Sequence, residues 1–114
     1  GNHDLNARNQ AGEKYARRIQ KARQFGVPTD ADSLQLGGTL FTVCPWWDGP
    51  ESCRQIPPLF ERDKPVRKER WVWVYHGPPS NSPTCWDGRK HFGDDELLGW
   101  IEQYRPDMVL TGHI

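Results

Sequence analysis

Apolar positions near the start of the chain recur with a helical period. In residues 11–25, charged side chains surround one apolar stripe, which consists of Ala11, Tyr15, Ile19, Ala22 and Phe25. This pattern predicts a helix, and Gly26 with the following Pro28 is a suitable stop signal. The basic residues of the segment either bind phosphate or form a solvated face, and a solvated face is the favoured interpretation.

Three further stretches have the patterns of strands. Residues 33–44 read as two short strands joined by a hairpin turn at Gly37-Gly38. The continuous run "WVWVY" at 71–75 is typical of a strand that is covered on both faces. Residues 105–113 predict a break followed by a short buried strand. Between these strands, the polar and Pro-broken residues 54–70 are interpreted as a surface excursion that has room for one short helix.

The second half of the chain predicts a strand–helix–strand unit. Residues 94–104 open with acidic side chains and carry one apolar stripe of Leu97, Trp100, Ile101 and Tyr104. Two buried strands joined by a helical crossover are most simply parallel neighbours. Ligands of such sheets bind beyond the carboxyl ends of the strands, where His76 and His113 both fall. The fold class is therefore α/β.

Composition sets limits on the class of protein. The 114 residues form at most one ordinary domain, and the balance of 15 Lys+Arg against 15 Asp+Glu does not favour a nucleic-acid or membrane partner. No apolar run is long enough to span a bilayer. Cys44, Cys53 and Cys85 form no C-x-x-C pair, so we expect reduced thiols, no structural zinc site and a cytoplasmic location.

Histidines at loop glycines or prolines are the candidate chemistry. Imidazole is a common ligand of divalent metals, and an adjacent Asn adds an oxygen ligand. An Asp directly after a His orients the ring or stabilises the imidazolium. Each of His3, His76 and His113 taken alone is best read as solvated. Because His76 and His113 both directly follow neighbouring strands, a metal site is as plausible for this pair as solvated side chains.

The segments "GNHD", "VYHGPP" and "GHI", in this order, resemble the later conserved blocks of the calcineurin-like metallophosphoesterases. In that family an Asp-x-His block and a Gly-Asp-x-x-Asp block precede Gly-Asn-His-Asp/Glu, a lone His and Gly-His-x-His. The resemblance runs from Gly1 to Ile114 and covers the latter part of the family's domain. It implies part of a four-layer α/β/β/α sandwich with two mixed β-sheets.

The resemblance also implies roles for individual residues. Asn2, His76 and His113 would ligate one of two divalent metal ions (Mn, Fe, Zn or Co). His3 would be catalytic beside the phosphate, and Asp4 would fix its orientation. A metal-activated hydroxide would attack phosphorus in line. The activity implied is that of a metallophosphoesterase, with a phosphodiesterase as the favoured type, acting on a small phosphorylated substrate or nucleotide.

The sequence departs from the family pattern in one important respect. It holds neither the Asp-x-His block nor the Gly-Asp-x-x-Asp block, because "FGDDE" at 92–96 stands in the wrong order and opens a helix. About half of a dinuclear site remains, so we expect this chain alone to be inactive and to bind at most one metal weakly. The missing N-terminal half of the domain would supply neighbouring strands, and we expect sheet edges and apolar faces to be uncovered without it.

Tryptophans in two loops are the candidate walls of a substrate pocket. Trp46, Trp47 and Trp86 either stack a nucleobase or aromatic leaving group, or shield the metals and fill the loops. Cyclic nucleotides, nucleic-acid ends, phospholipid headgroups and phosphoproteins all stay open as substrates. Two other functions also stay open: a non-catalytic scaffold on a degenerate phosphoesterase fold, and a Trp-rich nucleic-acid-binding module.

Overall fold

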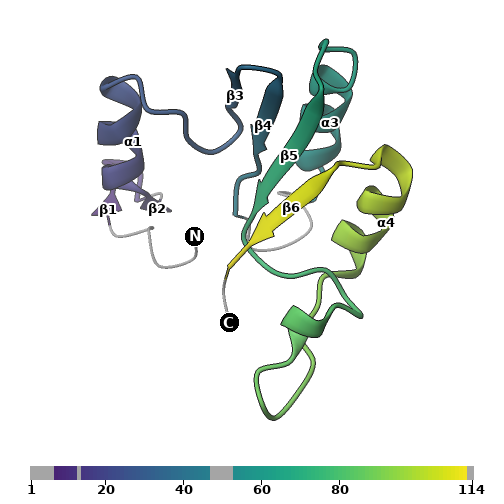
Figure 1. The fold of residues 1–114 in the computed structure, drawn as a ribbon. Helices are drawn as coiled ribbons and strands as arrows, with labels where there is room; N and C mark the ends of the chain where they lie inside the picture. Colours follow the sequence, from purple (N-terminus) through teal and green to yellow (C-terminus); the bar gives the residue numbers. More distant parts are fainter. Residues whose placement is uncertain (1–6, 13, 47–52, 113–114) are drawn as a thin grey trace.

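The computed structural model describes residues 7–12, 14–46 and 53–112, which form a mixed α/β structure (Figure 1). A two-stranded ribbon near the N-terminus pairs β1 (Ala7–Arg8) with β2 (Lys14–Tyr15), and α1 (Arg17–Gln24) follows it. The remaining elements are β3 (Ser33–Leu36), β4 (Thr39–Val43), α3 (Ile56–Asp63), β5 (Arg70–Tyr75), the short 3₁₀ helix η1 (Pro83–Cys85), α4 (Asp95–Tyr104) and β6 (Met108–Thr111).

Four strands form one mixed sheet in the order β3-β4-β5-β6. The hairpin of β3 and β4 is antiparallel, and Gly37 adopts the positive φ of 56° that its two-residue turn requires. The β4–β5 and β5–β6 pairs are parallel, with Val43 opposite Val74 and Tyr75 opposite Thr111. The predicted hairpin and the predicted parallel strand–helix–strand unit are therefore confirmed.

One face of this sheet carries the aromatic core. Alternation along β5 places Trp71, Trp73 and Tyr75 on the face that α3 and α4 cover, and all three are buried. Phe60 of α3 stacks on Trp73 with ring centroids 3.7 Å apart, and Tyr104 of α4 packs against Phe60 at 5.2 Å. Both helices lie on the same side of the sheet as a result (Figure 1).

The interpretation of residues 54–70 as a surface excursion is wrong for α3. Ile56 and Phe60 are fully buried, and Asp63 at the end of the helix is only 2% exposed. The two prolines at the first helical positions lack only N–H groups that have no partner inside a helix, so they start this helix instead of breaking it. The Pro-broken appearance of the sequence therefore conceals a core helix.

The opposite face of the sheet is apolar along all four strands. The cross-strand register places Thr39 and Arg70 at one end of this face and eight apolar side chains along it: Leu34, Leu36, Phe41, Val43, Val72, Val74, Met108 and Leu110. No described helix packs on this face, and Leu36, Met108 and Leu110 are 59%, 55% and 46% exposed. The strand at 71–75 is therefore covered by helices on its tryptophan face only, and β6 forms an edge of the sheet within the described residues.

The helix predicted over residues 11–25 is shorter than expected. Lys14 and Tyr15 pair with the preceding strand, so α1 begins only at Arg17. It ends as predicted at Gly26, where the amides of Gly26 and Val27 donate to the carbonyls of Arg23 and Ala22. No residue of α1 is buried, and Phe25 just after it is 76% exposed. Figure 1 shows α1 on the far side of the sheet from α3 and α4.

Candidate functional site at the carboxyl edge of the sheet

The three parallel strands end together, and the loops that leave them meet. The backbone amide of Cys44, just after β4, donates to the carbonyl of Val74 at 2.9 Å. The amide of Gly112, just after β6, donates to the carbonyl of His76 at 3.1 Å. His76 thus lies at the carboxyl edge between the neighbouring strands, which is where sequence analysis predicts a ligand site.

Two cavities flank His76. The first has a volume of about 170 Å³ and is lined by Pro45, Trp46, Tyr75, His76, Gly77 and Asp94. The second has a volume of about 210 Å³ and is lined by Asp30, Val43, Cys44, Trp46, Val74, Tyr75, His76 and Gly112. Trp46 packs edge-on against the imidazole, with ring centroids 5.7 Å apart and an interplanar angle of 76°. The predicted pocket wall Trp46 therefore adjoins the predicted ligand His76.

Asp94 is a residue of this edge that sequence analysis missed. Its Oδ1 accepts a hydrogen bond from the amide of Leu97 and caps α4, while its Oδ2 accepts the phenolic hydrogen of Tyr75 at 2.6 Å. These two contacts hold the carboxylate at the wall of the 170 Å³ cavity. The sequence signal was the acidic start of a helix, which indicates a cap but does not show that the cap faces a cavity.

Cys44 also lines the edge, but it is poorly suited to chemistry. Burial, together with the negative charge of Asp63, raises the pKa of its thiol to about 12. The thiolate is the nucleophilic and metal-binding form of cysteine, so Cys44 is inert at neutral pH. This agrees with the expectation of structurally ordinary thiols.

Four of the five predicted ligand and catalytic residues lie outside the described residues, as does the predicted pocket wall Trp47; the four are Asn2, His3, Asp4 and His113. Among the residues that the structure describes, no group of three or more His, Cys, Asp or Glu side chains is arranged to hold a metal ion. His76 is therefore the described member of the predicted set. Its neighbour in space, Gly112, directly precedes His113 in the chain.

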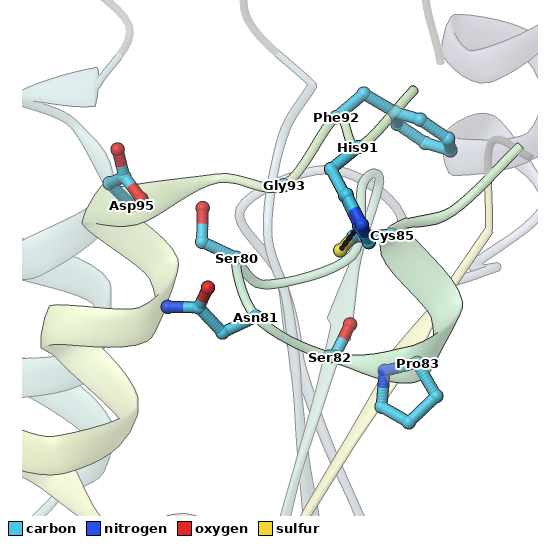
Figure 2. Close-up of a pocket in the computed structure, with 9 residues that line it drawn as sticks. All are labelled: Ser80, Asn81, Ser82, Pro83, Cys85, His91, Phe92, Gly93 and Asp95. Carbon is cyan, nitrogen blue, oxygen red and sulfur yellow. Dashed lines mark hydrogen bonds between the residues drawn. The ribbon is translucent and has the colours of Figure 1, made fainter. Parts of the chain in front are cut away.

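A larger hollow lies in the loop between β5 and α4. It has a volume of about 590 Å³, and Figure 2 shows the nine residues that line it. Within it, Cys85 Sγ and His91 Nδ1 lie 3.3 Å apart. Trp86 packs on His91 with ring centroids 4.8 Å apart and lines none of the three cavities described here. The structure thus brings Trp46 to His76, and it places Trp86 in a separate loop.

The segment "GRKHFG" forms an exposed turn at the tip of this loop. The carboxylate of Asp87 accepts hydrogen bonds from the backbone amides of Lys90 and Arg89, and these bonds lower the pKa of Asp87. Arg89, Lys90 and His91 are exposed. These contacts define a surface turn.

The chain matches no family model, and no curated protein or solved structure matches it either. In the described part of the chain, no helix is both long enough and apolar enough to cross a membrane.

Proposed function

We propose that this chain is part of a metal-dependent phosphoesterase that hydrolyses a phosphodiester. The observation that carries the proposal is the meeting of three strand ends at His76, where the amide of Gly112 binds the carbonyl of His76 and two cavities open beside the ring. In this proposal His76, His113 and Asn2 ligate one metal, and His3 with Asp4 serves the phosphate. The proposal assigns no residue of this sequence to a second metal.

The described residues of the edge suit this role for His76. An imidazole nitrogen is a good ligand for Mn, Fe, Zn or Co, and this ring lines open cavities. The edge-on contact with Trp46 restricts rotation of the ring. A bound divalent metal would neutralise phosphate oxygens and lower the pKa of a coordinated water.

The sheet also supports the finer proposal of a four-layer sandwich. One face of the sheet packs against α3 and α4, and the other presents the eight apolar side chains that the register aligns. A second mixed sheet packed against that face would bury Met108 and Leu110, which are now half exposed. The helix layer and sheet described here would then be two of the four layers.

Metal-induced stabilisation tests the proposal without requiring turnover. We expect Mn²⁺ to raise the melting temperature of the chain, because an ion that binds only the folded state stabilises it by about 2.7 kcal/mol at a hundred times its dissociation constant. His76→Ala should abolish this rise. The matched control is His91→Ala, which removes a histidine from the separate loop and should leave the rise intact.

Two outcomes would contradict the proposal. If His76→Ala keeps the full metal-induced shift, His76 is not a ligand. If His91→Ala alone removes the shift, the ion binds in the loop beside Cys85 and not at the strand ends. Calorimetric unfolding of both variants without metal shows whether either change damages the fold itself.

A further inference from the structure

The 170 Å³ cavity beside His76 combines aromatic walls with one carboxylate. Trp46 and Tyr75 are aromatic lining residues of the cavity, and Asp94 supplies the single carboxylate among its described lining residues. Pro45 and Gly77 complete the wall with little polar surface. Pockets for drug-sized ligands have volumes of roughly 300–1,000 Å³, so this cavity fits only a small headgroup.

The walls of this cavity are held in place before any ligand binds. The phenol of Tyr75 donates to Asp94 Oδ2, and the ring of Tyr75 packs edge-on against Trp100 of α4 at 6.4 Å. Trp46 packs edge-on against His76. Because fixed side chains lose little freedom on binding, such a cavity binds a complementary group at low entropic cost.

The hydrogen bonds of Asp94 define the kind of positive group that fits. Both carboxylate oxygens already accept a hydrogen bond, from Leu97 and from Tyr75, yet the negative charge stays. A primary ammonium must place three N–H donors, and the lining residues Pro45, Trp46 and Gly77 have no side-chain acceptor for them. A quaternary ammonium has no N–H to satisfy and needs only charge and aromatic contact.

We propose that this cavity binds the quaternary ammonium of a choline-type group. Trp46 and Tyr75 provide cation–π contact, and Asp94 provides the compensating charge. The biological role of this binding rests on the proposed phosphoesterase function. Because the cavity adjoins His76, it would hold the choline end of a phosphodiester while the phosphate lies at the histidines. The negative charge of Asp94 disfavours an anionic group beside it in the cavity.

Two ligands of equal shape distinguish binding that depends on the positive charge from binding by apolar burial alone. Choline is titrated into the chain by isothermal calorimetry, and its carbon isostere 3,3-dimethyl-1-butanol is titrated in parallel. We expect saturable binding of choline and at least about tenfold weaker binding of the neutral alcohol, since a desolvated cation–π contact is worth about that factor. Equal affinity for the two ligands, or no saturable binding of choline to the folded chain, overturns the proposal.

Variants at neighbouring positions locate the binding. Asp94→Asn keeps a good helix cap and an acceptor but removes the charge, and it should erase the preference for choline. The matched control Asp95→Asn removes one charge from the same helix turn, at a residue that lines the other hollow, and should leave the preference unchanged. Trp46→Ala should weaken choline binding at least about tenfold, while Trp46→Phe should keep part of it.

The readout separates this proposal from the proposed function. Choline binding needs neither metal nor turnover, so it can be lost while the Mn²⁺-induced stabilisation survives, and the reverse also holds. Choline affinity that is unchanged in both Asp94→Asn and Trp46→Ala would place the ligand elsewhere and overturn the assignment. Circular dichroism of each variant confirms that the comparison is made between folded chains.

Discussion

Helices α1 and α3 have the same length of eight residues but opposite roles in the structure. Helix α3 buries Ile56, Phe60 and Asp63 against the sheet. Helix α1 buries no residue, and Phe25 and Val27 beyond its end are 76% and 51% exposed. In sequence, α1 has the clearer apolar stripe and α3 the more broken one.

This difference shows that apolar periodicity in a sequence predicts the apolar face of a helix but does not predict which surface that face packs against. Most helical stability in proteins comes from tertiary packing, and an isolated helix of this length is marginal in water. Helix α3 is stabilised by the aromatic side chains of β5 and α4. Helix α1 instead has its own hydrogen bonds, its C-cap and the exposed contacts of Arg23 with Asp30 and Asp32. Stability should therefore be concentrated on the α3 side of the molecule.

The largest expected effect is that of Phe60→Ala. The ring of Phe60 is fully buried, stacks on Trp73 and contacts Trp71, Trp100 and Tyr104. Removing it leaves a cavity between α3 and the sheet, so we expect a loss of about 3–5 kcal/mol in the free energy of unfolding, measured by urea denaturation.

The matched substitution in α1 is Ile19→Ala. Ile19 is half-buried in a helix that has no buried residue, and we expect a loss below about 1 kcal/mol. If Ile19→Ala were as destabilising as Phe60→Ala, the contrast between the two helices would be false.

The second-largest loss in the free energy of unfolding is expected when Asp63, the last residue of α3, is replaced. Its buried carboxylate accepts hydrogen bonds from Ser33 at 2.5 Å and Thr42 at 2.6 Å and pairs with Arg62 at 2.7 Å. Asp63→Ala should cost about 2–3 kcal/mol, because Thr42 and Ser33 lose a charged acceptor. The control Asp32→Ala removes a 40% exposed carboxylate that pairs with Arg23 and accepts from the amide of Thr29, and it should cost less than Asp63→Ala, about 1 kcal/mol.

The same carboxylate makes stability depend on acidic pH. Burial alone would raise the pKa of Asp63, but the hydrogen bonds from Arg62, Ser33 and Thr42 outweigh it and hold the pKa below its usual range. Its stabilisation is therefore complete above about pH 4, the unfolded value, and is lost as the pH falls through the lower folded value. Urea midpoints measured from pH 6 to pH 2 should fall more steeply for the natural chain than for Asp63→Ala.

The β3–β4 hairpin and the parallel β5–β6 pair were predictable from sequence because their signals are local, whereas the parallel pairing of β4 with β5 was not predicted. Two glycines mark the β3–β4 turn, and an unbroken apolar run marks β5. The burial of helix α3 was missed because Ile56 and Phe60 are separated by prolines and followed by charges, and only the tertiary structure shows that this helix packs on Trp73. The buried Asp63 was missed for a similar reason, since its partners Ser33 and Thr42 lie 30 and 21 residues away along the chain.

The candidate site was predictable in position and only partly in content. The rule that sites lie at the carboxyl ends of parallel strands placed His76 correctly at that edge, and the adjacent loop placed Trp46 beside it. Asp94 could not be found this way, because a helix cap that turns its carboxylate toward a neighbouring strand has the same sequence as one that faces solvent. Whether His76 binds metal stays a prediction.

A smaller loss of stability is expected at alkaline pH when Tyr104 ionises. Tyr104 lies at the end of α4 and packs against Phe60. Burial and the hydrogen bond to Glu61 raise the pKa of this phenol to about 12. The unfolded phenol titrates near pH 10, so its stabilisation is complete below that pH and is lost as the pH rises toward 12. Tyr104→Phe should cost about 1 kcal/mol at pH 7 and should flatten the fall in urea midpoint between pH 10 and pH 12. An unchanged alkaline profile in this variant would contradict the assignment.

The smallest loss of stability is expected for replacement of Phe25. This substitution tests whether the α1 side of the molecule contributes as little to stability as the comparison with α3 implies. Its ring is 76% exposed, so Phe25→Ser removes almost no buried surface, and the C-cap bonds of Phe25 and Gly26 use backbone groups only. We expect a change within about 0.5 kcal/mol in the urea midpoint experiment. A loss as large as that for Asp63→Ala would mean that the ring is buried in solution against a surface of this chain or a second copy. Repeating the measurement over a hundredfold range of protein concentration separates the two, because only association with a second copy makes the loss depend on concentration.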